Sequence, residues 1–92
     1  MKYFLVELTE YNGEQEYSHN IVIESDNKES ARIDAENYAK TFYDDDDVTE
    51  DDGMYSFFVE SINVSIDSIA EMSMEDIKEY LWNSALVQQQ KQ

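Results

Sequence analysis

The side chains best suited to chemistry in this chain are the acids of residues 44–52, DDDDVTEDD. Seven of these nine residues are Asp or Glu, and no Lys or Arg interrupts them. Carboxylates this close together could hold a divalent cation, because Ca²⁺ and Mg²⁺ prefer oxygen ligands. They could equally form a hydrated spacer, or present an anionic surface to a basic partner. The spacing of the acids tests the first of these three hypotheses, the metal site.

The acidic run does not have the spacing of an EF-hand loop. Such a loop needs acids at positions 1, 3 and 5, Gly at position 6 and Glu at position 12. Aligning Gly53 with position 6 places Val48 at the first position and Val59 at the last. Because valine offers no side-chain oxygen, we predict neither a metal site nor a metal cofactor. Weak association of divalent cations with the acids remains an alternative.

His19 is the only histidine, and it is the second candidate for chemistry. A His–carboxylate dyad would need an acid across a hairpin, such as Glu7, together with a nucleophile. Ser18 points to the opposite side of the same strand, because successive strand residues alternate between faces. The chain has no Cys, no HExxH, no GxSxG and no Gly-rich phosphate loop. We therefore predict no catalytic residues, no cofactor and no enzymatic activity.

The first elements that would position these side chains are two strands. Residues 2–11 alternate between apolar and mixed faces, and residues 16–24 do the same. Asn12-Gly13 lies between them and is a strong hairpin signal, since Gly readily adopts the positive φ of a tight turn. These two segments are predicted to form an antiparallel hairpin.

A helix is predicted to follow, because the apolar spacing changes at Ser25-Asp26. Either of these two residues could cap it, and Glu29 would complete a near capping box after Asp26. Ile33 falls on the opposite side and is expected to be exposed or in a contact. The buried face of this helix combines small and aromatic side chains: Ala31, Ala35, Tyr38, Ala39 and Phe42.

The second half of the chain should hold one extended segment and another helix. The acidic run would break the first helix near Tyr43, and Gly53 would end that run. Residues 54–69 read as a strand whose apolar phase changes near Glu60-Ser61, which implies a bulge or a turn. A second helix would begin at Ser73, with Asp76 in the cap. The prediction is an α+β fold of order β-β-α-β-α, with an antiparallel sheet of three or four strands and two helices on one face. One domain would span 1–87, followed by a polar disordered tail at 88–92.

Net charge limits the partners. The chain has 22 acids and six bases, a formal charge of −16, and between Lys40 and Lys78 it has twelve acids and no base. Nucleic acids and anionic membranes are poor partners, because contact would bring like charges together. A basic protein surface is the natural partner, and nucleic-acid-binding proteins commonly own such surfaces. Because there is no Cys and no signal peptide is recognised, a cytoplasmic location is expected.

The predicted partner-binding residues are acids of the first helix and of the run that follows it. A second candidate contact is apolar, because Trp82 and Leu86 stand four residues apart, away from the core stripe of the second helix. Together with Ile33 they could contact a partner or a second copy, so a structural or regulatory homodimer, with acids serving solubility, is the alternative function. The acids are Glu29, Glu36, Asp44, Asp45, Asp46, Asp47, Glu50, Asp51 and Asp52.

In size, charge and its DDDDVTEDD block, the chain resembles small acidic proteins of phages and mobile elements. These include DNA-mimic anti-restriction proteins and anti-CRISPR proteins, which do not share one fold. The resemblance implies inhibition, in the cytoplasm of a bacterial host, by occupation of a basic nucleic-acid channel on a nuclease or effector complex. It carries over no individual residue, since no diagnostic motif is shared.

Overall fold

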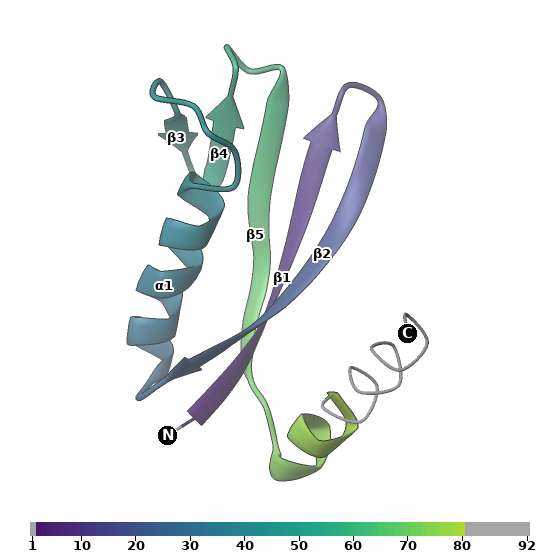
Figure 1. Cartoon of the computed structure of the whole chain (residues 1–92), viewed down its shortest axis with the longest axis vertical. Helices are drawn as coiled ribbons and strands as arrows, with labels where there is room; N and C mark the ends of the chain where they lie inside the picture. The colour runs from purple at the N-terminus through teal and green to yellow at the C-terminus, as the bar shows by residue number, and fades with distance from the viewer. Residues whose placement is uncertain (1, 81–92) are drawn as a thin grey trace, which may run out of the picture.

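A computed structural model of the chain describes residues 2–80, which form an α+β fold (Figure 1). One helix follows the first two strands, and three further strands precede a second helix that is described over residues 74–80. The predicted class is confirmed. The elements in chain order are β1 (Lys2–Asn12), β2 (Gln15–Ser25), α1 (Lys28–Lys40), β3 (Thr49–Asp51), β4 (Met54–Phe57) and β5 (Ile62–Glu71).

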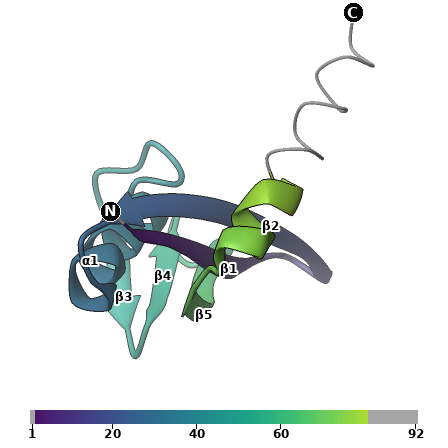
Figure 2. The ribbon, with the colours of Figure 1, turned by 90° about the horizontal axis from the view of Figure 1, so that it is seen from below.

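All the strands belong to a single antiparallel sheet with the order β2-β1-β5-β4-β3. The sheet has five strands, more than the three or four expected, for two reasons. Part of the acidic run forms β3, and the extended segment after it divides into β4 and β5. In Figure 2 the β1–β2 and β3–β4 hairpins extend in different directions, which shows that the sheet is strongly twisted.

The predicted β1–β2 hairpin is confirmed. Asn12 pairs with Gln15, so Gly13 and Glu14 form a two-residue turn. Gly13 has a φ of +65°, the conformation that glycine adopts without the steric penalty of a Cβ. The register then runs without a shift from this turn to the pair of Lys2 with Ser25.

The predicted phase change between Phe57 and Ile62 is a turn rather than a continuation of one strand. Phe58, Val59 and Glu60 all have positive φ, and the Ser61 N–H donates to the Phe58 carbonyl over 3.3 Å. Val59 has the same parity as Tyr55 and Phe57 but does not share their face, because it lies in the turn and is 96% exposed.

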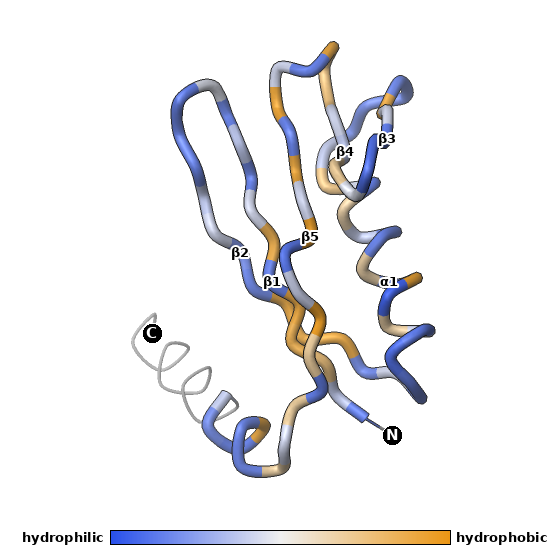
Figure 3. Tube along the Cα trace, turned by 180° about the vertical axis from the view of Figure 1, so that it is seen from behind, coloured by the Kyte–Doolittle hydropathy of each residue, from blue (hydrophilic) through white to orange (hydrophobic). Residues whose placement is uncertain are grey.

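A separate irregularity in β5 was not predicted. Leu8 pairs with Ile66 and Glu7 pairs with Ser68, so Asp67 is an extra residue in the ladder. One extra residue in a strand shifts the alternation of its side chains between the two faces of the sheet by one position. Ile66 and Ile69 therefore pack against the same core, and the hydropathy of β5 alternates along its length in Figure 3.

The core lies between α1 and one face of the sheet. Ala31, Ala35 and Ala39 are fully buried, as the helical spacing predicted, and their small side chains allow α1 to lie close to the strands. The N-cap of α1 is Asn27, one residue after Asp26 and two after Ser25, because the Asn27 carboxamide oxygen accepts the Ser30 N–H over 2.8 Å. The sheet contributes the large buried side chains: Phe4, Val6, Leu8, Tyr55, Phe57 and Val64.

The second helix is capped as predicted but does not share a face with α1. The Ser73 N–H donates to Asp76 over 3.2 Å and the Asp76 N–H donates to Ser73 Oγ over 3.1 Å. Asp76 and Tyr80 line a shallow groove with Leu5 and Ala70, whose side chains belong to the face opposite α1. Figure 1 shows the two helices on different sides of the lower part of β5. The expectation that both helices cover one face is therefore wrong, because the apolar side chains of this second face offer another packing surface.

Trp82 and Leu86 lie outside the described residues, as does the predicted boundary between the domain at 1–87 and the tail at 88–92. No helix in the described part of the chain is long and apolar enough to span a membrane.

Candidate functional site

Part of the acidic run, Thr49–Asp51, forms the edge strand β3, so the run is not merely a spacer. Residues 44–52 are called the acidic edge here. Within it β3 pairs with β4, matching Glu50 with Tyr55 and Asp51 with Met54. Because Tyr55 faces the core and Met54 lies on the other side of the sheet, Glu50 and Asp51 project to opposite faces. The edge therefore presents negative charge on both sides of its strand.

The turn between β3 and β4 explains how the acidic edge enters the sheet. Asp52 and Gly53 have φ values of 51° and 80°, so both central residues of this two-residue loop are left-handed. Asp-Gly is one of the preferred pairs for a hairpin turn of this type. The helix before the acidic run was expected to end near Tyr43, and α1 ends at Lys40 with Thr41 as its cap. The Asp-Gly signal was present in the sequence and was obscured by the surrounding acids.

Asp45 has a structural role within the acidic edge. Its carboxylate accepts the Phe58 N–H over 2.7 Å and the Asp47 N–H over 3.0 Å. These two backbone hydrogen bonds, chiefly the one from Phe58, lower the pKa of Asp45 below its ordinary value. The loop after α1 is thereby tied to the β4–β5 turn, and Asp45 is less available to a partner than its exposed neighbours Asp44, Asp46 and Asp47.

Of the two helical acids predicted to bind a partner, only Glu36 joins the acidic edge. Glu36 and Glu50 line the same groove between α1 and β3. Burial, and then the charges of Glu50 and Glu36, raise the pKa of Tyr55, which lies between them. Glu29 lies in the first turn of α1, roughly 10 Å along the helix from Glu36 at ~1.5 Å per residue. Ile33 is exposed, as expected, and lines the same groove.

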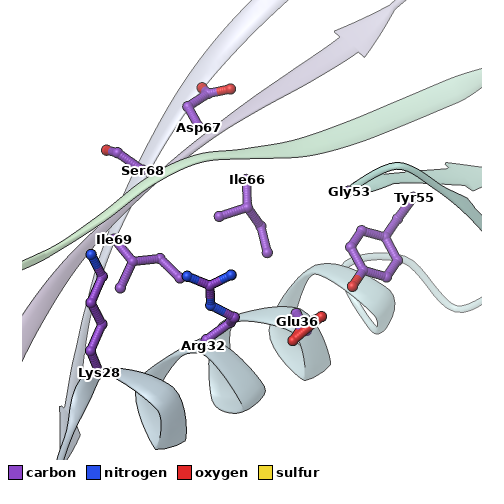
Figure 4. A pocket seen from close by; sticks show the side chains of 9 residues that line it. All are labelled: Lys28, Arg32, Glu36, Gly53, Tyr55, Ile66, Asp67, Ser68 and Ile69. Atoms are coloured by element: carbon purple, nitrogen blue, oxygen red, sulfur yellow. The ribbon is translucent and has the colours of Figure 1, made fainter.

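A second groove, of about 290 Å³, runs between α1 and β5 (Figure 4). Lys28 and Arg32 extend from the helix toward β5, over the apolar side chains of Ile66 and Ile69. Asp67 also borders this groove, but its carboxylate accepts hydrogen bonds from Thr9 and Ser65. Within residues 2–80 neither Lys28 nor Arg32 forms a salt bridge, so these two helix cations do not neutralise the acidic edge.

Within residues 2–80 no ion pair compensates the negative charge of the acidic edge. The ion pairs in this part of the chain are Lys2 with Glu71, at 3.6 Å, and, when the imidazole is protonated, His19 with Glu10, at 2.9 Å. Lys40 lines the groove beside Glu50 without approaching it within 4 Å. The exposed carboxylates of the edge are consequently directed to solvent and available to a positively charged surface.

His19 belongs to a second polar feature, a partly buried cluster with Glu10 and Tyr43. Glu10 is only 5% exposed, with Oε1 lying 2.9 Å from His19 Nε2 and Oε2 accepting a hydrogen bond from the Tyr43 hydroxyl. Glu7, the example given above of an acid across the hairpin, is not the carboxylate that His19 contacts. Glu7 lies on the other face of β1 and accepts a hydrogen bond from Ser68 over 2.9 Å. Glu10 continues the buried series Phe4, Val6 and Leu8, so its parity was the signal that could have identified it.

The Glu10–His19–Tyr43 cluster joins three separate elements through one carboxylate. Tyr43 follows α1 and immediately precedes the acidic edge. The hydrogen bond to Glu10, then burial, raise the pKa of Tyr43 to about 12. Aromatic contacts support the arrangement, with ring centroids 5.0 Å apart for His19 and Phe42 and 5.5 Å apart for Tyr43 and Phe57. The cluster therefore holds the beginning of the acidic edge against the sheet.

The cluster has the composition of a proton-transfer site but lacks a nucleophile. Tyr43 is a neutral phenol at ordinary pH, and its raised pKa makes it a still weaker acid than a free tyrosine. Ser18 pairs with Thr9 on the other face of the sheet, away from His19. Within residues 2–80 no three metal-ligating side chains gather into a group that could hold a metal ion. In the described residues the cluster connects β1, β2 and the segment after α1 through its hydrogen bonds.

Comparisons of the chain with protein-family models, with curated proteins and with solved structures found no match. Function is therefore argued from the arrangement of its own side chains.

Proposed function

We propose that this chain is a non-enzymatic acidic protein that occupies a basic, nucleic-acid-binding surface of a partner protein or effector complex. One observation carries the proposal: the acids of residues 44–52 lie on the edge strand β3, in its turn and in the preceding loop that Asp45 anchors, and none of them is paired with a cation within residues 2–80. A partner's Lys and Arg side chains would supply the missing charge. Because the edge is already ordered, little conformational entropy would be lost on binding.

Along the axis of β3, the spacing of its two acids is compatible with imitation of a nucleic-acid strand. Consecutive residues of a strand advance by about 3.3 Å, and phosphates of one DNA strand repeat every ~3.4 Å along the axis. Glu50 and Asp51 are consecutive and project to opposite faces of β3. An edge charged on both sides fits a cleft with two basic walls better than a flat surface. The preferred partner is therefore a protein with a basic channel, and the expected effect is inhibition by exclusion of its nucleic acid.

Capture experiments on the whole chain test this proposal. The immobilised protein should retain basic nucleic-acid-binding proteins from a bacterial lysate at low salt, and release them as salt rises, because exposed charges are screened beyond about 10 Å at 0.1 M. The variant Asp44→Lys, Asp46→Lys, Asp47→Lys should lose this capture. Asp45 is left unchanged because it holds the loop.

A matched variant separates the edge from the overall charge. Glu14, Asp34 and Glu75 are exposed and lie outside the acidic edge, and replacing all three by Lys changes the net charge by the same amount. This control should retain most of the captured protein. Equal capture by the wild type and by the edge variant would contradict the proposal, and so would equal loss in the edge variant and the control.

A further inference from the structure

The two edges of the sheet differ in how they are protected from pairing with another strand. β3 is only three residues long, and two of them, Glu50 and Asp51, are acids. Short length and charge are two of the devices that keep an edge strand from accepting a further strand. β2, at the other edge, is eleven residues long. Because β2 is long, it lacks one of the two devices that protect β3 from pairing with a further strand.

β2 has a continuous backbone along which a further strand could pair. Its register with β1 has no bulge, and its central segment, residues 18–23 (SHNIVI), contains no Pro, Lys, Asp or Glu. Of the strands in the described chain, only β1 pairs with it, which leaves its outer edge open. An edge strand of this kind presents unpaired N–H and C=O groups and acts as a template for strand addition.

The charges on β2 lie at its two ends and on one face. Glu16 pairs with Tyr11 and Glu24 pairs with Tyr3, so both carboxylates lie on the face opposite α1. Both are exposed, and they bracket Ser18, Asn20 and Val22 on that face. A strand added beside β2 would meet negative charge at each end and neutral side chains between.

We propose that the outer edge of β2 receives an extended, basic segment of the partner protein as a sixth strand. Lys or Arg side chains of that segment would face Glu16 and Glu24, and an apolar side chain would face Val22. The inference rests on the proposed function for the basic character of the partner. It adds a second contact to the acidic edge, at the opposite end of the sheet.

A second copy of this chain fits the β2 edge poorly. Each copy carries a formal charge of −16. In a symmetric antiparallel pairing centred on Asn20, Glu16 of one copy would face Glu24 of the other. Like charges directly opposite each other destabilise a strand pair. The charge of this edge therefore selects a basic segment from another protein.

A synthetic peptide tests the inference without the natural partner. The probe is Lys-Thr-Val-Thr-Thr-Thr-Val-Thr-Lys, whose terminal lysines match the separation of Glu16 and Glu24 in either strand direction. Titrated into the ¹⁵N-labelled chain at low salt to millimolar concentration, it should shift the β2 amide resonances saturably and slow their hydrogen exchange. A peptide N-methylated at every internal amide keeps the charge but cannot pair as a strand, and it should lose these effects.

Charge variants complete the test. Glu16→Gln with Glu24→Gln should weaken peptide binding roughly two- to thirtyfold, since each of the two exposed ion pairs contributes ~0.2–1 kcal/mol. Asp51→Asn with Asp52→Asn removes the same charge from the other edge and should leave the affinity nearly unchanged. Equal binding of the methylated peptide, shifts confined to β3, or no saturable shift in β2 would overturn strand addition. None of these results would alter the capture expected of the acidic edge, so the two proposals can fail separately.

Discussion

The hydroxyl of Tyr43 donates a hydrogen bond to the carboxylate of Glu10, a buried side chain 33 residues earlier in the chain. Tyr43 immediately precedes the acidic edge, and Glu10 lies on the core-facing side of β1. The bond therefore connects the segment with the densest charge to the centre of the sheet. Asp45 provides a second connection, to the β4–β5 turn. These two contacts with distant parts of the chain thus determine where the exposed acids are placed.

Replacing Tyr43 by Phe should destabilise the fold. The change removes the hydrogen bond to Glu10 and leaves a buried carboxylate with one partner fewer. Hydrogen bonds to charged groups contribute about 1.5–3 kcal/mol, and because Tyr43 is only half-buried, a loss of about 1–2 kcal/mol is expected. Urea denaturation of both proteins measures the change. Tyr38→Phe alters an exposed tyrosine and should leave the free energy of unfolding nearly unchanged, and an equal effect of both variants would contradict the role of Tyr43.

Stability should fall at alkaline pH as Tyr43 ionises. Its pKa is raised from 10.0 to about 12 in the folded protein, so folding favours the neutral phenol. The corresponding stabilisation is fully present below pH 10.0 and is lost as pH rises to about 12. Tyr55, whose pKa is also raised, contributes in the same direction. The free energy of unfolding across this range should decline more steeply for the wild type than for Tyr43→Phe, and parallel curves would contradict the assignment.

Loss of the Asp45 carboxylate should release the acidic edge locally. Asp45→Asn weakens the acceptor for the Phe58 and Asp47 N–H groups, so these two amides should exchange with solvent faster. Asp46→Asn removes the same charge and should not affect their exchange. In the wild type, protonating Asp45 has a similar effect. Because its folded pKa is lowered, the stabilisation is present above the ordinary value of 3.8 and is lost as pH falls through the folded value.

Glu10 should behave as the shared centre of its cluster. Glu10→Gln keeps the shape of the side chain but removes the charge that His19 and Tyr43 contact, and a cost of about 1–3 kcal/mol is expected. Combined with Tyr43→Phe, the two changes should cost less than the sum of the single changes, since residues in one network couple by ~0.5–3 kcal/mol. Simple additivity in a double-mutant cycle would show that the two side chains act independently.

The features that were predictable from the sequence are those with strong local signals. The Asn12-Gly13 pair predicted the first hairpin, and the spacing of Ala31, Ala35 and Ala39 predicted the buried face of α1. The class of fold followed from the order of these elements. Such signals act over a few residues and do not depend on the rest of the chain.

Other features depend on distant partners and were missed. Glu10 resembles a surface acid until His19 and Tyr43 are placed beside it, and Asp45 resembles its neighbours until the Phe58 N–H is placed. Asp52-Gly53 is a local hairpin signal, but the run of acids around it was interpreted as a spacer or binding loop. The bulge at Asp67 is visible only once β5 is aligned with β1. Of the predicted site, the sequence identified the acids but not which of them the fold gathers at one edge.

The most direct test of the central claim is a competition for a partner captured at low salt. The partner is first bound to a fluorescently labelled DNA duplex, and the chain is then added while the anisotropy of the duplex is followed. If the acidic edge occupies the nucleic-acid-binding surface, the chain displaces the duplex completely and competitively, and the Asp44→Lys, Asp46→Lys, Asp47→Lys variant does not. If the chain binds the partner while the duplex stays bound, or if the variant displaces the duplex equally well, the claim is contradicted.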